Sequence, residues 1–375
     1  MITFMNPILY IFLILFWAFG FVLLWRIPLA NRGEKHRLDP EKVSVIIPAR
    51  NEENKIGLLL RSLEDQTLHP GEIIIVDDHS EDGTVAVAKN SRCTIIPSKK
   101  LPPGWLGKPW ACWQGAGEAQ GETLLFLDAD VFLTPDGFAK ILAVFSRERQ
   151  ILSIQPYHRM ERAYEQLSAF FNLVIMAGMN AFTPLGAKLR PSGAFGPSLM
   201  CLKKDYFTLN GHERVRDAVL ENLALGKEFI KEGYNVSCYG GKGSLEFRMY
   251  PEGLGSLVQG FGKAFGIGAN ATSILSLVMI VCWIFGGFSL TRHLIHSAVV
   301  GNEAALIFFL GLDLAYAGQI YWMLLRIGNF RFATALFFQI PLLFFVLVFI
   351  LSVAQTFIFR RARWKGRTVE PKKIL

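Results

Sequence analysis

Long apolar segments at both ends of the chain limit its possible architectures more than any other feature. Residues 7–25 contain no charged side chain, and this length is enough to cross a hydrocarbon core of about 30 Å at about 1.5 Å per residue. No lysine or arginine precedes this segment and no small-residue cleavage motif follows it, so an uncleaved anchor is favoured over a cleaved signal peptide. We therefore expect an N-terminal transmembrane helix within residues 1–26.

Basic residues beside the first apolar segment indicate how the chain is oriented in a membrane. Five of them follow the segment closely: Arg26, Arg32, Lys35, Arg37 and Lys42. By the positive-inside rule, these residues lie in the cytoplasm together with the domain that follows them. We therefore expect a multi-pass protein of the cell membrane whose catalytic domain is cytoplasmic.

The C-terminal region, residues 271–359, contains three more apolar stretches that are each long enough to span a membrane: 271–290, about 304–325 and 333–359. The basic tail, residues 360–375, has seven lysines and arginines and one acidic residue. Three spans would leave this tail outside, whereas two would return it to the cytoplasm, so the number of C-terminal spans stays open between two and three. The charge of the tail favours anionic lipid, and not nucleic acid, as its partner.

The central block, residues 39–252, alternates strand-like and helix-like segments. Runs rich in Ile, Val and Leu predict buried parallel strands at 43–48, 72–77, 93–97 and 123–128. After the first of these, Asn51 is expected to cap a helix that runs over residues 52–66. The pattern predicts a doubly wound α/β sheet of Rossmann type, with ligands at the carboxyl ends of its strands. A further apolar stretch, residues 167–182, is expected to form a buried or membrane-facing helix of this domain.

Acidic residues follow two of the predicted strands. Asp77 and Asp78 end the second strand, where a simple turn is the alternative interpretation. Asp128 and Asp130 end the fourth strand, and alternate residues of an extended segment can point into one cleft. Two such carboxylates repel each other unless a cation joins them, and their oxygens suit Mg²⁺ or Mn²⁺ held together with a substrate diphosphate. The five cysteines are scattered without a Cys-x-x-Cys pair, so a zinc site is not indicated.

Four motifs resemble, in order and spacing, those of the family 2 glycosyltransferases, which have the nucleotide-sugar-binding fold called GT-A: VSVIIPARNEE, VDDHSEDGT, GWLGKPWACWQG and FLDAD. The resemblance covers most of residues 42–250 and implies a hexosyltransferase that uses a UDP-sugar. It implies that residues after the first two strands bind the nucleotide: Pro48, Ala49, Arg50, Glu52, Asp77 and Asp78. It also implies that Asp128 and Asp130 hold the divalent ion, with Asp128 near the ribose or the metal. Lys108 would lie near the donor, unless it is a solvated loop lysine.

The acceptor side resembles the family over residues 190–215, where Gly193 is an anchor, but departs from it farther along. Family members usually have a Glu-Asp pair whose Asp is the general base, and here the pair is Glu221 and Asn222. Either Glu221 or Asp217 takes over this role, or the acceptor needs little help. A hydroxyl is protonated at neutral pH, whereas a carboxylic acid with a pKa of about 4 to 5 is already an anion. The departure is therefore compatible with a carboxylate acceptor.

The glycine-rich segment 253–270 is amphipathic, and we expect it to lie at the membrane interface and lead a lipid acceptor to the cleft, unless it packs on the catalytic domain. The motif RMYPEG, together with GWLGKPWAC, is similar to the bacterial branch of the family that acts on a C30 carotenoid acid, 4,4'-diaponeurosporenoate. This resemblance implies inverting transfer of glucose from UDP-glucose to a carboxylate, which gives a glucosyl ester. One alternative is a hydroxyl lipid acceptor: a hopanoid, diacylglycerol or polyprenyl phosphate. Another is a nucleotide-binding membrane scaffold or transporter.

Overall fold

The structure is a computed structural model that describes residues 7–31, 38–146, 149–269, 272–354, 362–364 and 367–369. The chain divides into two compact units. The sheet unit consists of Ile27–Arg159 and Arg190–Met249, and the helical unit of Met1–Arg26, Met160–Leu189 and Tyr250–Leu375. Three of the orienting basic residues, Arg32, Lys35 and Arg37, lie outside the described residues, as does most of the basic tail.

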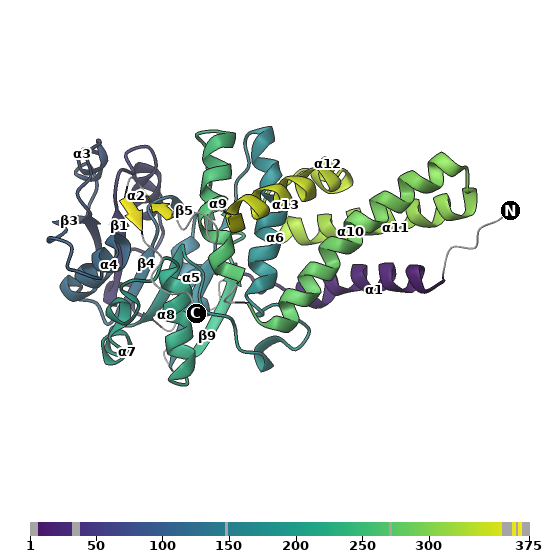
Figure 1. The fold of residues 1–375 in the computed structure, drawn as a ribbon. Helices are drawn as coiled ribbons and strands as arrows, with labels where there is room; N and C mark the ends of the chain where they lie inside the picture. Colours follow the sequence, from purple (N-terminus) through teal and green to yellow (C-terminus); the bar gives the residue numbers. More distant parts are fainter. Residues whose placement is uncertain are drawn as a thin grey trace. The chain divides into compact units, whose positions relative to one another are not determined.

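A seven-stranded sheet with the order β3-β2-β1-β4-β8-β6-β9 forms the centre of the sheet unit (Figure 1). Its strands are β1 (Val43–Ala49), β2 (Glu72–Asp77), β3 (Thr94–Pro97), β4 (Thr123–Leu127), β6 (Gln150–Gln155), β8 (Ser198–Leu202) and β9 (Asn235–Gly240). Neighbouring strands pair in parallel except at β8, which runs antiparallel between β4 and β6. The expected α/β fold and its four predicted strands are confirmed, and each strand lies within one residue of its predicted bounds.

Short helices and a second, three-stranded sheet complete the sheet unit. The helices are η1 (Pro40–Lys42), α2 (Ile56–Glu64), α3 (Thr84–Ala88), α4 (Gly107–Glu118), α5 (Gly137–Val144), α7 (Lys203–Thr208), η4 (Gly211–Val215) and α8 (Glu221–Lys231). The small sheet pairs β5 (Val131–Leu133), β10 (Leu245–Phe247) and β7 (Tyr157–His158) in that order. Val45 and Ile47 of β1 are fully buried in one core with Leu59 and Leu63 of α2, because the apolar stripe of α2 faces the sheet.

The predicted cap of the first helix is wrong. The helix begins at Ile56, not at Glu52, and Asn51 does not cap it. Asn51 has a φ of +52°, in the left-handed region that asparagine tolerates better than most residues. Its side-chain oxygen accepts a hydrogen bond from the backbone N–H of Glu81 at 2.8 Å. Asn51 therefore joins two loops, and the chain turns once more before the helix starts.

The helical unit contains α1 (Pro7–Leu23), η2 (Ala163–Ser168), α6 (Ala169–Gly178), η3 (Gly186–Lys188), α9 (Leu254–Ala269), α10 (Ile274–Val300), α11 (Glu303–Ile327), α12 (Phe332–Leu336) and α13 (Gln339–Val353). By length and composition, α10 and α11 are able to cross a membrane. The apolar helices α1, of 17 residues, and α13, of 15 residues, are shorter than a typical span. Residues 362–364 and 367–369 of the tail form an antiparallel pair, β11 and β12.

The third C-terminal apolar stretch, residues 333–359, is not one continuous helix. This affects whether the C-terminal region has two or three spans. Its helix ends at Leu336 and a new one starts at Gln339. Pro341 explains the break, because proline has no N–H to donate to the carbonyl of Phe337 and its ring crowds that carbonyl. Ile340 N instead bonds to Phe337 O in a tighter turn, at 3.0 Å. The long span expected over 333–359 is thus a short turn of helix followed by a 15-residue helix, and residues 355–359 lie outside the described residues.

Polar side chains join α1, α10 and α11 inside the helical unit. Gln319 of α11 accepts a hydrogen bond from Trp283 Nε1 of α10 at 2.9 Å and donates one to the carbonyl of Trp17 in α1 at 2.8 Å. Gly20 makes this approach possible, since a Cβ there would lie 2.4 Å from the Gln319 side-chain oxygen. These bonds satisfy groups that would otherwise be unpaired in an apolar setting.

The glycine-rich segment expected at a membrane interface forms the helix α9. Its residues Leu257 and Phe261 are buried, and the Phe261 ring stacks on Phe171 of α6 with centroids 4.1 Å apart. One side of α9 is therefore covered within the helical unit. Leu254, at its start, is 45% exposed, and the side chains of residues 263–271 lie outside the part of the chain that is described.

Candidate active site

The loops that follow β1 and β2 are joined by a series of hydrogen bonds. Asn51 N donates to Ser80 Oγ at 3.0 Å, and Glu52 N donates to Thr84 Oγ1 at 2.7 Å. Gly83 N donates in turn to the carboxylate of Glu53 at 2.7 Å. Because each loop supplies partners for the backbone of the other, the two form one rigid edge at the carboxyl ends of the strands.

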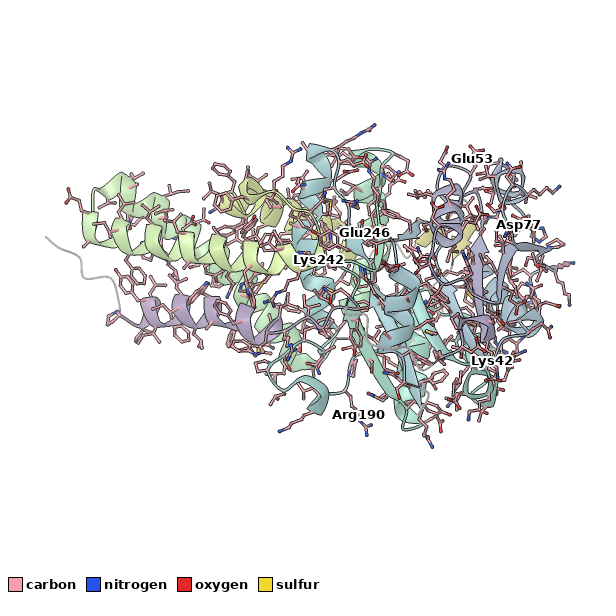
Figure 2. All side chains as sticks on the ribbon, turned by 180° about the vertical axis from the view of Figure 1, so that it is seen from behind. Lys42, Glu53, Asp77, Arg190, Lys242 and Glu246 are labelled. Carbon is pink, nitrogen blue, oxygen red and sulfur yellow. The ribbon has the colours of Figure 1, made fainter. Side chains whose placement is uncertain are left out.

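The residues expected at the nucleotide lie at this edge, where Glu53 and Asp77 are labelled in Figure 2. Asp77 ends β2, and its carboxylate accepts from Ser80 N at 3.3 Å. Asp78 N donates to the carbonyl of Ala49 at 2.8 Å, and Arg50 Nη1 donates to the carbonyl of Asp78 at 2.7 Å.

The register of β1 and β2 determines the positions of Pro48 and Ala49. Pro48 lies opposite Val76, and Ala49 lies opposite Asp77, in the parallel pair of β1 and β2. Pro48 has no N–H, and it lies beyond the ladder with β4, whose register ends at Ile46. The structure thus brings Pro48, Ala49, Arg50, Glu52, Asp77 and Asp78 together.

Asp128 and Asp130 follow β4 directly, as expected from the sequence. Asp128 N donates to the carbonyl of Pro197 at 3.0 Å, which holds the strand end against the segment leading into β8. Burial raises the pKa of Asp130 to about 6, and the charge of Asp128 contributes in the same direction. A carboxyl group whose anion is destabilised by its neighbours is a site that a cation would stabilise.

Lys55 is a charged neighbour of Asp130 that the motifs did not single out. Its charge acts to lower the pKa of Asp130, whereas the charge of Glu52 acts to raise it. Both residues lie in the loop after β1, so this loop reaches the end of β4 as well as that of β2. In the sequence, only the position of Lys55, four residues after Asn51, connects it with the site. That position is too weak a signal to identify Lys55 as a site residue.

Lys108 connects the end of β4 to the start of α8. Its Nζ atom lies 2.6 Å from Asp128 Oδ1 and 2.6 Å from Glu221 Oε1. Burial alone would lower the pKa of Lys108, but Asp128 and Glu221 raise it well above the usual value, so the group is an ammonium ion. The side chain is 19% exposed and projects from the first turn of α4, so Lys108 is not a solvated loop lysine.

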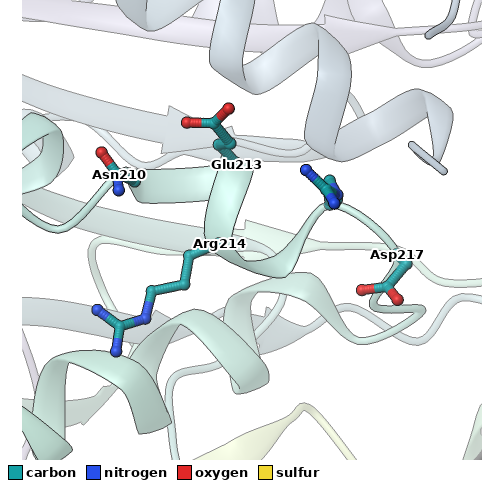
Figure 3. A pocket seen from close by; sticks show the side chains of 5 residues that line it. Asn210, Glu213, Arg214 and Asp217 are labelled. Atoms are coloured by element: carbon teal, nitrogen blue, oxygen red, sulfur yellow. The ribbon is translucent and has the colours of Figure 1, made fainter. Parts of the chain in front are cut away.

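Of the two candidate acidic residues on the acceptor side, only Glu221 joins this cluster. Glu221 is the first residue of α8 and is 6% exposed. Asp217 is exposed and lines an open surface pocket together with Asn210, Glu213, Arg214 and Arg216 (Figure 3). Among the described residues, no contact joins the Asp217 side chain to Lys108, Asp128 or Asp130.

Gly193 positions the segment that precedes β8. Its φ is +153°, and a Cβ at this residue would lie 2.3 Å from the carbonyl oxygen of Leu223 in the first turn of α8. Farther along α8, a Cβ on Gly226 would lie 2.4 Å from Ala194 N. These two glycines therefore permit direct backbone packing between α8 and residues 193–196, and this packing sets the place of Glu221.

His212 and Tyr206 are buried neighbours of the cluster that the sequence did not identify as site residues. Both are fully buried, and Tyr206 Oη lies 2.9 Å from His212 Nδ1. Asn222, which stands where the family usually has Asp, is buried as well, and its Nδ2 donates to the carbonyl of Gly196 at 2.5 Å. The NGHE turn marks His212 in the sequence, but a single histidine without a metal-binding spacing gives no reason to place it here.

The residues present fit a divalent ion that is shared with a substrate. Within the part of the chain that the structure describes, no three His, Cys, Asp or Glu side chains are grouped so as to hold a metal by themselves. Asp128 and Asp130 nevertheless offer carboxylate oxygens at one strand end, and Asp130 is destabilised as an anion there. Mg²⁺ and Mn²⁺ are commonly held by one or two carboxylates, with phosphate oxygens and waters completing the shell.

Comparisons with known proteins agree with this geometry. A family model described as glycosyl transferase family 2 matches residues 44–197. The chain is 35% identical over 329 residues to 4,4'-diaponeurosporenoate glycosyltransferase of Staphylococcus aureus strain USA300, a match that covers 87% of each chain. The protein of that name from strain MRSA252 is similar to the same degree, with 35% identity over 87% of each chain. Among solved structures, a mannosyltransferase from Pyrobaculum calidifontis in complex with GDP-Man and Mn²⁺ shares the fold, with a TM-score of 0.51 and 15% identity over 93% of this chain and 99% of that one.

Proposed function

The chain belongs to glycosyl transferase family 2, and on that premise we propose that it is an inverting glucosyltransferase that uses UDP-glucose and a membrane lipid acceptor. The acceptor that we propose is the carboxylate of a C30 carotenoid acid, so that the product is a glucosyl ester. The name of the Staphylococcus aureus relatives, which are glycosyltransferases of 4,4'-diaponeurosporenoate, supports this acceptor. The choice of UDP-glucose follows the resemblance in the sequence motifs.

The joined loops after β1 and β2 would bind the nucleoside. Asp77 would hold the base or ribose at the carboxyl end of β2, while Arg50 and Glu52 line the same edge. Asp78 would act by fixing Arg50, which donates to its carbonyl at 2.7 Å and lies 3.7 Å from its carboxylate. Ligands of doubly wound sheets bind at this end of the strands, which supports the assignment.

Asp130 and the carboxylate of Asp128, whose Oδ1 contacts Lys108, would hold Mg²⁺ or Mn²⁺ together with the donor diphosphate. When bound, the ion would offset the negative charge that builds up on the leaving diphosphate. The mannosyltransferase that shares this fold was solved with GDP-Man and Mn²⁺, which supports a nucleotide-sugar and a divalent ion here. Lys108 adds a fixed positive charge beside Asp128.

The observation that carries the choice of acceptor is the contact between Lys108 and Glu221. A carboxylate that already binds an ammonium group at 2.6 Å is a poor proton acceptor, because protonating it would break that ion pair. Asn222 cannot act as a base either, since an amide does not take up a proton near neutral pH. An acceptor that is already an anion needs no such base.

The transfer step is then balanced without a proton. The carboxylate oxygen of the acceptor forms a bond to the anomeric carbon of glucose, on the face opposite the diphosphate. The bond from that carbon to the diphosphate oxygen breaks, and its electron pair leaves with UDP. Glu221, kept in place by Lys108, would line the acceptor side and exclude water from it.

We further propose that the chain is a multi-pass protein of the cell membrane with the sheet unit in the cytoplasm. The length and composition of α10 and α11 support two C-terminal spans, and α1 would serve as the N-terminal anchor within residues 1–26. Under this proposal residues 39–252 form the catalytic domain, 253–270 an interfacial segment, 271–359 the C-terminal membrane region and 360–375 a tail on anionic lipid. Two spans also return that tail to the cytoplasm, as its charge favours.

The test uses the full chain in detergent with radiolabelled UDP-glucose and Mn²⁺ or Mg²⁺. The acceptors are a C30 carotenoid acid, the corresponding alcohol and a mixed bacterial lipid extract. We expect a metal-dependent, alkali-labile glucosyl ester on the acid and little product on the alcohol. The matched variants are Asp130→Asn, which should lower transfer by about 100-fold, and Asp65→Asn, which changes an exposed carboxylate outside the site.

Three results would contradict parts of this proposal. Label found only on the alcohol or on hydroxyl lipids of the extract would keep the enzyme but overturn the carboxylate acceptor. Transfer that is unchanged by EDTA and by Asp130→Asn would overturn the metal assignment. UDP binding without transfer from any nucleotide-sugar would favour a nucleotide-binding scaffold or transporter.

A further inference from the structure

Two helix ends of the helical unit meet at a pair of tryptophans and an arginine. Arg326, in the last turn of α11, lies over the ring of Trp322, with its guanidinium carbon 3.9 Å from the ring centroid. Its Nη1 atom donates to the carbonyl of Trp25, which follows the end of α1, at 3.3 Å. Trp322 also contacts α1, because its ring centroid lies 5.6 Å from that of Phe21. The ends of α1 and α11 therefore form one polar and aromatic surface.

The proposed membrane orientation brings these two ends to the same side of the bilayer. It puts the end of α1 in the cytoplasm, and the two spans α10 and α11 return the chain to the cytoplasm at the end of α11. The contact between Arg326 and Trp25 supports this orientation, because it joins the two ends that the orientation brings together. Tryptophan is enriched at the level of the lipid headgroups, which is where both rings would lie.

This surface is positively charged. Arg26 follows Trp25 directly and is exposed. The sequence has no acidic residue in positions 1–33, which include α1, or in positions 314–369, which include the second half of α11. Apart from the bond to Trp25, the N–H groups of Arg326 have no hydrogen-bond partner among the described residues. The guanidinium group is therefore fixed in place but still able to bind an anion.

Apolar side chains beside the two arginines are exposed as well. Trp25 is 54% exposed, and Val22 of α1 and Leu325 of α11 are also exposed. Hydrocarbon chains would cover these side chains, whereas water would not do so favourably. A ligand with an anionic head and apolar tails matches both parts of the surface.

The segment that follows α11 is fixed before any ligand binds. Asn329 accepts from the backbone N–H of Met160 at 2.6 Å and donates to its carbonyl at 3.1 Å. Gln166 Oε1 accepts from the backbone N–H of Arg331 at 3.0 Å. Arg331 adds an exposed positive charge at this end of the unit, while Glu161, next to Met160, is an acidic residue on the facing segment. Because the end of α11 is already ordered, binding there would cost little conformational entropy.

We propose that the ends of α1 and α11 bind the headgroup of an anionic phospholipid, through a headgroup site made up of Trp25, Arg26, Trp322 and Arg326. The inference rests on the membrane location proposed above. The planar guanidinium of Arg326 offers two parallel N–H groups to phosphate oxygens, and the ring of Trp322 orients its plane. Arg26 adds a second charge, and the acyl chains would lie along Val22 and Leu325.

The test titrates the full chain in detergent with phosphatidylglycerol or with phosphatidylcholine of the same acyl chains, and native mass spectrometry counts the bound lipid. We expect Arg326→Gln to bind phosphatidylglycerol about fivefold more weakly than the wild type and phosphatidylcholine equally well. The matched control is Arg61→Gln, which changes an exposed arginine of α2 in the sheet unit and should bind both lipids as the wild type does. The basic tail is present in every variant, so its lipid cancels in the comparison.

A second variant keeps the inference testable if Arg326→Gln does not fold. Arg26→Gln changes an exposed side chain, and we expect about the same fivefold loss for phosphatidylglycerol. Binding of phosphatidylglycerol that equals the Arg61→Gln control, or an equal loss for phosphatidylcholine, would overturn the headgroup site. The membrane location is judged separately, by whether the wild-type protein stays in the membrane fraction after a high-salt wash; its release would overturn that location.

Discussion

Replacing Lys108 by Met is the perturbation that tests the site most directly. Methionine keeps much of the length and apolar stem of lysine but removes the ammonium group, which lies 2.6 Å from both Asp128 and Glu221. Both carboxylates then lose their counter-ion at once. Since Glu221 is almost fully buried, its charge cannot be compensated by water as it would be on the surface.

The size of the effect follows from the burial of the three groups. Breaking a buried ion pair by removing one partner typically costs about 3 to 5 kcal/mol, and the 27% exposure of the Asp128 side chain argues for the lower end, about 3 kcal/mol. For a domain of this size, such a loss lowers the melting temperature by about 6 °C or more. Transfer should fall by about 100-fold or more, because a fixed positive charge beside the leaving diphosphate is lost.

The assay is thermal unfolding and sugar transfer by the full chain in detergent, with Lys100→Met as the matched control. Lys100 is exposed and lies outside the site, so its variant should stay within about 0.5 kcal/mol of the wild type. The double variant Lys108→Met/Glu221→Gln should recover part of the lost stability, since it also removes one unpaired carboxylate. A melting temperature for Lys108→Met that matches the Lys100→Met control, or no recovery in the double variant, would refute the reasoning.

Three further predictions follow from single contacts. Asp130→Asn should lower transfer by about 100-fold while UDP binding in EDTA stays unchanged, as measured by calorimetry; an equal loss of UDP binding in EDTA would contradict this. Burial lowers the pKa of His158 to about 3, so below about pH 6.5 the unfolded chain binds a proton at this residue that the folded chain does not. The free energy of unfolding should therefore be about 2 kcal/mol lower at pH 5 than above pH 6.5. The melting temperature of His158→Leu should change less between pH 7 and pH 5 than that of the wild type. Gly226→Ala should destabilise by about 1 to 3 kcal/mol because a Cβ would lie 2.4 Å from Ala194 N, whereas Gly117→Ala, with open space around it in α4, should stabilise by about 0.5 to 1 kcal/mol; melting curves that agree for the two would count against this packing.

The strands of the sheet unit were predictable because their signal is local. Runs such as IIIVD and LLFLD combine β-branched or large apolar residues with a polar end, and a parallel strand buried on both faces requires that composition. The antiparallel β8 was not predicted. Its direction depends on pairing with β4 and β6, whose paired residues lie 46 to 79 positions away, and no local pattern encodes such pairing.

Two expectations about helices, the cap at Asn51 and the long span over residues 333–359, were also wrong. Asn51 has the composition of a cap, but it bonds to Glu81 of another loop, so a tertiary contact replaced the local one. In the third C-terminal stretch, the sequence does contain the signal, since Pro341 marks the break in an otherwise continuous apolar run. The span expected over residues 333–359 was inferred from hydrophobicity alone, which does not detect a helix break at a proline. The expected span was too long for this reason.

The acceptor side shows most clearly that the motifs do not determine every residue of the site. From the sequence, Asn222 is a missing carboxylate, and Glu221 and Asp217 are equivalent candidates to replace it. In the structure Glu221 is buried and contacts Lys108, whereas Asp217 is exposed. Lys108 lies more than one hundred positions earlier in the chain, so the sequence alone does not show this contact. It also gives the Asn222 amide nitrogen a partner before β8, the carbonyl of Gly196, to which an ionised carboxylate could not donate. The change from Asp to Asn therefore has a physical reason of its own, because the amide donates to a buried carbonyl where an ionised carboxylate would place a negative oxygen against it.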